Sequence, residues 1–116
     1  MATLTFTIPG KIHGYRQATR KMLWLKSNRA YGEFKTKVLL LAMEAGWKCK
    51  AIATKEYPPF LSVLVRWNKN PRIDWKNVYG GIEDALFEED RYVKPGNKSG
   101  VEWDAGVEEA IVTIET

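Results

Sequence analysis

Carboxylates stand at both ends of one segment in an otherwise basic chain. Asp74 lies where a stretch of helical spacing begins, and Glu88, Glu89 and Asp90 lie where it ends. Mg²⁺ prefers oxygen ligands and usually binds one or two carboxylates, with water and phosphate oxygens completing its shell. Acidic groups at the C-terminal end of a helix also oppose the helix dipole, which favours a cation beside them. The residues therefore predict a divalent-metal site that involves Asp74 and the acidic run.

Each acidic position also has an ordinary structural explanation. Asp is a preferred residue at a helix N-cap, and acidic runs are mostly solvated surface. A helix of about 12 residues is roughly 18 Å long, so Asp74 and Asp90 meet only if the chain after the helix folds back toward its start. The residues alone leave both interpretations open.

The composition fits a small globular domain with a polyanionic partner. The chain has 116 residues, of which 45% are hydrophobic and 28% charged, and its formal net charge is +4. That charge favours nucleic acid as the partner. A single cysteine and a single histidine exclude an internal disulfide and a zinc site built from those ligands. We expect one domain over residues 1–116, without a signal peptide or a membrane span, in the cytoplasm.

Hydrophobic spacing predicts the elements that would position these groups. Apolar and polar residues alternate over residues 3–8, 60–67 and 110–114, which predicts three strands. Spacings of three and four predict two helices, over residues 30–45 and 75–86. This order, β-α-β-α-β, predicts a fold of the α/β (α+β) class, in which two helices pack on a small mixed β-sheet.

A long basic loop over residues 11–29 is expected before the first helix, and loops of this length in small domains are usually functional or mobile. The predicted buried faces of the two helices are Tyr31, Phe34, Val38, Leu41 and Ala45, and Trp75, Val78, Ile82, Ala85 and Leu86. Gly80 and Gly81 interrupt the second helix at a cost of about 1 kcal/mol each relative to Ala. Their presence predicts the close approach of another backbone, with the surface between two subunits as one candidate.

The acidic segment resembles the core motif of the RusA family of Holliday junction resolvases. The family pattern is Asp-x-Asp-Asn-x-x-Lys, followed by Asp-Ala-Leu and then an acidic pair. Asp74 and Asn77 match the first part, and Asp84-Ala85-Leu86 matches the second without a gap. Glu89-Asp90 stands at the acidic pair. The basic segment that starts at Ile8-Pro9-Gly10-Lys11 is also similar, and the order of elements agrees, so the resemblance spans nearly the whole chain.

The resemblance implies a homodimeric endodeoxyribonuclease, bacterial or phage-encoded, that resolves four-way DNA junctions in recombination and repair. It implies that Asp74, Glu89 and Asp90 hold Mg²⁺ or Mn²⁺, and that Asp74 and Asp90 are catalytic. Basic residues would contact DNA phosphates, which supplies affinity without sequence information. The DNA-binding residues expected are Arg16, Arg20, Lys21, Arg29 and Arg72.

Two positions depart from the family pattern. Lys76 occupies the place of the second Asp, and Gly80 the place of the Lys. Loss of a carboxylate weakens the site for a second metal, whereas the Lys76 ammonium is expected to offset phosphate charge during catalysis. Asn77, Asp84 and Glu89 are candidates for the compensating oxygen. The alternatives are a catalytically impaired RusA-like protein that only binds branched DNA, and a protein-interaction domain whose basic charge serves solubility.

Overall fold

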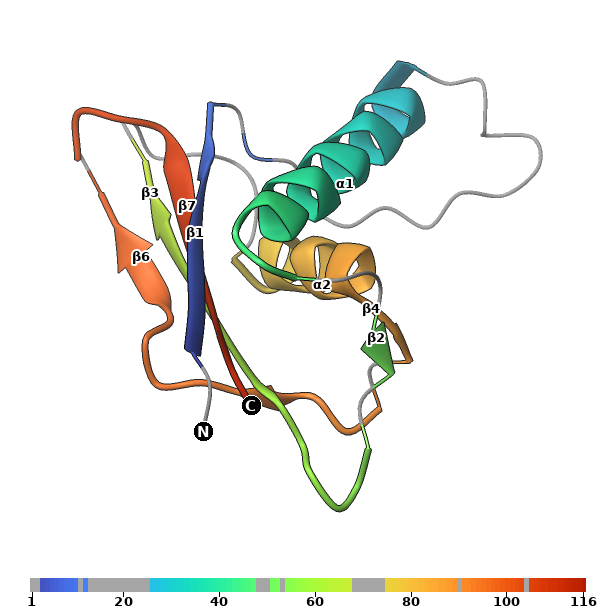
Figure 1. The fold of residues 1–116 in the computed structure, drawn as a ribbon. Helices are drawn as coiled ribbons and strands as arrows, with labels where there is room; N and C mark the ends of the chain where they lie inside the picture. The colour runs from blue at the N-terminus through green and yellow to red at the C-terminus, as the bar shows by residue number, and fades with distance from the viewer. Residues whose placement is uncertain are drawn as a thin grey trace.

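The computed structural model of the chain describes residues 3–10, 12, 26–47, 51–52, 54–67, 75–89, 91–103 and 105–116. Among these, residues 26–28, 51, 52 and 89 are described by their backbone alone. Two helices pack on one face of a mixed β-sheet, and a small two-stranded sheet lies beside the end of the second helix (Figure 1). The predicted α+β class, with two helices on a small mixed sheet, is confirmed.

The main sheet is built around the last strand of the chain. β7 (Glu109–Glu115) lies between β1 (Thr3–Pro9) and β3 (Phe60–Arg66) and is antiparallel to both. Two short strands, β5 (Lys94–Pro95) and β6 (Gly100–Glu102), run parallel to β3 along its other edge. The three strands predicted from alternation are therefore confirmed, and the structure adds β5 and β6.

Strand register explains why these segments alternate. Phe6, Val112 and Val63 lie opposite one another across the three strands, and all three are buried. The rows above and below repeat the pattern with aliphatic residues. Successive side chains of a strand point to opposite faces, so one face of β1, β7 and β3 is apolar throughout. This face forms one core with the two helices.

Helix α1 (Lys26–Glu44) begins four residues earlier than expected. Its N-terminal turn therefore occupies part of the predicted basic loop, and Arg29 lies on the helix. The buried face keeps the expected spacing through Tyr31, Phe34 and Val38 but ends at Ala42, because Ala45 lies beyond the helix and is exposed.

A Schellman motif ends α1. The Trp47 N–H donates to the Ala42 carbonyl at 2.9 Å, and the Gly46 N–H donates to the Met43 carbonyl at 3.1 Å. Gly46 has a φ of 119°, a backbone conformation that a side chain disfavours. The motif turns the chain sharply and brings Trp47 back toward the core, where it packs as a half-buried residue.

Helix α2 (Trp75–Leu86) has the bounds that the spacing predicts. The residues buried on its inner face are Val78, Gly81, Ile82, Ala85 and Leu86. Gly81 is buried and Gly80 is half-buried, and the close approach of another backbone expected at these two glycines stays a prediction. The Trp75 indole N–H donates to the Val63 carbonyl at 3.1 Å, which ties the start of α2 to the middle of β3.

The sequence analysis did not predict two further strands, because they are very short. β4 (Phe87–Glu89) follows α2 directly and pairs in parallel with β2 (Ala51–Ile52). Trp47 packs edge-on against Phe87, with ring centroids 5.6 Å apart, and joins this small sheet to the core. In the part of the chain that the structure describes, neither helix is both long enough and apolar enough to cross a bilayer.

Residues 96–99 connect β5 to β6 and press on the edge of β3. The Gly96 N–H donates to the Leu61 carbonyl at 2.8 Å, and the Ser99 hydroxyl accepts from the Val63 N–H at 2.9 Å. The buried Ser62 hydroxyl accepts from the Lys98 N–H at 3.2 Å. These bonds occupy the part of the β3 edge that lies between its pairing with β5 and its pairing with β6.

Candidate functional site

Helix α2 separates the two acidic segments. Trp75, the residue after Asp74, is its first residue, and Leu86 is its last. A helix of 12 residues is about 18 Å long. β4 continues from the end of α2, so the backbone of Glu89 lies at the far end of the helix from Trp75. Asp74 and Asp90 lie outside the described residues, so their predicted meeting at one metal is neither confirmed nor contradicted.

Lys76 and Asn77 lie in the first turn of α2, and both side chains are exposed. The first backbone N–H groups of a helix have no partners within the helix, and its dipole makes this end electropositive. The Lys76 ammonium adds a full positive charge at the same end. The start of α2 therefore combines the positive end of the helix dipole with one ammonium group, directly after the Asp74 carboxylate in the sequence.

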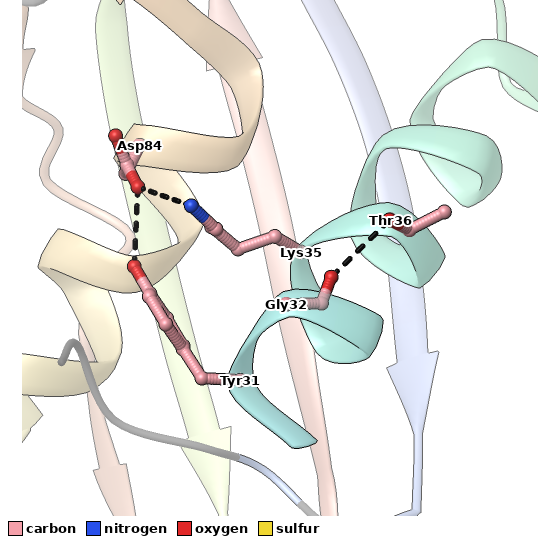
Figure 2. Close-up of polar contacts among 5 residues, drawn as sticks. All are labelled: Tyr31, Gly32, Lys35, Thr36 and Asp84. Carbon is pink, nitrogen blue, oxygen red and sulfur yellow. Dashed lines mark hydrogen bonds and ion pairs between the residues drawn. The ribbon is translucent and has the colours of Figure 1, made fainter. Parts of the chain in front are cut away.

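Asp84 lies on α2 but points toward α1 (Figure 2). Its Oδ2 atom accepts from the Lys35 Nζ at 2.9 Å and from the Tyr31 hydroxyl at 3.2 Å. The Lys35 ammonium also lies 4.9 Å from the centre of the Tyr31 ring. A carboxylate that a cation and a phenol already hold is a poor source of the compensating metal ligand.

The predicted DNA-binding residues are mostly outside the described part of the chain. Arg29 is placed, and it is exposed near the start of α1. Arg16, Arg20, Lys21 and Arg72 lie outside the described residues, as do Asp74 and Asp90. The arrangement of these basic residues around the motif stays a prediction.

The metal prediction depends on these same undescribed positions. Within the described residues, no group of three or more His, Cys, Asp or Glu side chains is placed to hold a metal ion. Asp84 is engaged by α1, and Glu89 is described by its backbone alone. The described residues do not build a Mg²⁺ site by themselves.

Two polar clusters were missed by the sequence analysis. One is the group of Tyr31, Lys35 and Asp84. In the other, Arg66 at the end of β3 donates to Glu102 of β6 at 2.6 Å and to Glu109 of β7 at 3.2 Å. The hydrogen bond that Arg66 donates to Glu102 raises the pKa of Arg66. The spacing of Tyr31 and Lys35 by four residues was the one available signal, since it places them on the same side of α1.

No protein-family model matches the chain, and no curated protein matches it.

Proposed function

We propose that this protein is a Mg²⁺-dependent, structure-selective endodeoxyribonuclease of the RusA type that resolves four-way DNA junctions as a homodimer. The observation that carries the proposal is the placement of the motif on one helix. α2 starts directly after Asp74, exposes Lys76 and Asn77 in its first turn, and leads at once into the strand that contains Glu89. We also propose that it acts in the cytoplasm, with a bacterial or phage origin.

Phosphate binding is the part of this function that the described residues support most directly. The amides at the start of α2 and the Lys76 ammonium attract an anion to one place. Arg29 supplies an exposed cation on α1. In the proposed enzyme Lys76 offsets charge on the phosphate that is cut, at the position where the family has an acidic residue.

Mg²⁺ is proposed from the sequence positions of Asp74, Glu89 and Asp90. Bound there, the ion would supply a Lewis acid for phosphodiester hydrolysis. In the proposed enzyme the described residues bind and orient the DNA.

A second candidate function is junction binding without cleavage. One observation favours it. Lys76 replaces a carboxylate of the family pattern. This replacement weakens a two-metal site while leaving the phosphate-binding features in place.

Incubation of the protein with a labelled four-way junction tests the proposal. With protein in excess, we expect Mg²⁺ or Mn²⁺ to produce symmetric cuts near the branch point, and EDTA to abolish them without releasing the DNA. Binding that is not followed by cutting in either metal would establish the second candidate. Absence of salt-dependent binding to the junction would exclude both and favour a protein-interaction domain.

Variants at the two acidic segments test which residues are needed for cleavage. Asp74→Asn and Asp90→Asn should each lower the cleavage rate by at least about 100-fold, since each removes a metal-binding charge, while junction affinity is kept. Glu56→Gln is the matched control, because Glu56 is exposed in the connection before β3 and lies outside both acidic segments. Equal loss in the control would contradict the assignment.

A further inference from the structure

Asp84 joins the two helices at one oxygen atom. Its Oδ2 receives the Lys35 ammonium at 2.9 Å and the Tyr31 hydroxyl at 3.2 Å, both from the first half of α1 (Figure 2). The Tyr31 ring is 5% exposed, so the phenol that reaches Asp84 has little freedom to move. We call these three residues the helix clamp.

The exposure of the helix clamp limits its value as a simple stabilising contact. The Lys35 and Asp84 side chains are 32% and 40% exposed. Ion pairs at such positions contribute little to folding stability, because water screens them and two side chains lose freedom. Hydrogen bonds are directional, so the bond between Asp84 and the buried Tyr31 phenol instead fixes the position of α1 relative to α2.

Apolar packing also joins α1 to α2. Phe34 and Val38 of α1 share the core with Val78 and Ile82 of α2. Apolar burial is non-directional, so it permits small shifts of one helix along the other. The Trp47 indole donates to the Leu86 carbonyl at 3.3 Å and holds the chain beyond the other end of α1. Among the described residues, the helix clamp is a directional polar contact between the first half of α1 and α2.

That half of α1 carries the cation assigned to DNA. Arg29 lies half a turn before Tyr31, and Lys76 and Asn77 lie on α2. The position of α1 on α2 therefore sets the distance between two proposed phosphate contacts. A shift of about 1 Å at such contacts is enough to slow a reaction about 100-fold.

We propose that Asp84 is a positioning residue which, through Lys35 and Tyr31, holds the cationic end of α1 in register with the first turn of α2 so that both engage one junction. This inference rests on the proposed nuclease function. It assigns to Asp84 a role in substrate placement and removes it from the candidate metal ligands.

Three variants and one control test the helix clamp. Asp84→Ala removes the shared acceptor, and Lys35→Met removes the cation. Asp84→Asn keeps a side-chain oxygen that both donors can reach. Glu102→Ala is the control, because it breaks the Arg66–Glu102 ion pair, whose side chains are 33% and 51% exposed and which lies on the sheet.

Cleavage at saturating junction is the first measurement. We expect Asp84→Ala to lower the turnover rate by about 10- to 100-fold with less than about a threefold change in junction affinity. Asp84→Asn should restore most of the rate, and Glu102→Ala should keep it. An equal loss in Glu102→Ala, or a loss in Asp84→Asn as large as in Asp84→Ala, would overturn the proposal.

Hydrogen exchange without DNA separates this inference from the proposed function. In Asp84→Ala and Lys35→Met we expect faster amide exchange in residues 29–38 of α1, with β3 and β7 unchanged. Unchanged exchange in α1 would show that Asp84 does not hold this helix and would overturn the inference whatever the enzyme does. A wild-type protein that cuts no junction would instead contradict the nuclease proposal, and the exchange data would still decide whether Asp84 fixes α1.

Discussion

Lys76 is the residue at which the chain departs most from the family it resembles. It stands where an aspartate would complete the metal site, in the exposed first turn of α2. An acid there would bind a metal ion, whereas in the proposed function the Lys76 ammonium binds the phosphate directly. The change therefore trades one source of positive charge for another at the same end of the helix.

Replacement of Lys76 by alanine should weaken junction binding by removing one phosphate contact. The plot of log binding constant against log salt concentration should lose about one unit of slope. Fluorescence anisotropy over a salt series measures this. Lys98→Ala is the control, since Lys98 is exposed in the connection beside β3 and should leave the slope unchanged. An unchanged slope in Lys76→Ala would remove Lys76 from the DNA-binding surface.

The candidate site could be predicted from the sequence only where the contacts are local. Asp74, Lys76 and Asn77 are neighbours along the chain, so their order around the start of α2 follows from helical spacing. The link between Asp84 and Lys35 joins residues 49 positions apart, and it depends on how two helices cross. Such a crossing is set by the whole core, which is why Asp84 was grouped with the metal ligands.

At the scale of elements, the connection between β5 and β6 depends on the absence of a side chain at Gly96. A Cβ atom at this position would lie 2.0 Å from the Ser62 hydroxyl and 3.4 Å from the Leu61 carbonyl carbon. Ser62 is buried in the centre of β3, and its hydroxyl already accepts from Lys98. Neither the serine nor the strand backbone can retreat without loss of hydrogen bonds.

Gly96→Ala should therefore lower the free energy of unfolding by about 1–3 kcal/mol, as forced overpacking does. Gly32→Ala on α1 is the counterpart, because a Cβ atom there meets nothing within 4 Å. That change should raise the free energy of unfolding by about 0.5–1 kcal/mol through the higher helix propensity of Ala. Urea denaturation measures both changes. If both variants raised, or both lowered, the free energy of unfolding, this account of Gly96 would be contradicted.

The sequence predicts those helices and strands in which the spacing of buried apolar residues repeats several times. α2 has its predicted bounds because its apolar residues recur through three turns. β2 and β4 have two and three residues, too few to show a period, and they form only because the chain brings them together. The early start of α1 was missed because its first turn carries no apolar face. The order β1–β7–β3 was not predictable, since it depends on pairing between distant segments.

At the scale of the whole molecule, symmetric cutting of a junction requires two copies of the chain. In the proposed function each protomer offers one helix end to a phosphate, at the start of α2. A twofold assembly would present two such ends to the two strands that are cut. Charged surface on both protomers also makes assembly on DNA sensitive to salt.

The active species should therefore have about twice the chain mass of 13.3 kDa. Light scattering after size-exclusion chromatography measures this at the concentrations at which cleavage is assayed. In a mixture of wild-type and inactive Asp74→Asn protein, paired cuts should fall faster than single nicks. A monomeric mass together with paired cuts from one binding event would contradict the dimer.

The central place of β7 has a consequence for how the chain acquires its structure. In the main sheet β1 and β3 do not pair with each other. Each of them pairs with β7, residues 109–115. During synthesis the first strand lacks its ladder partner, so its backbone N–H and C=O groups stay unpaired with β7 until about a hundred further residues have been made. We expect chains stopped before β7 to be bound by chaperones or to aggregate, whereas chains stopped after Glu115 fold in a single late step.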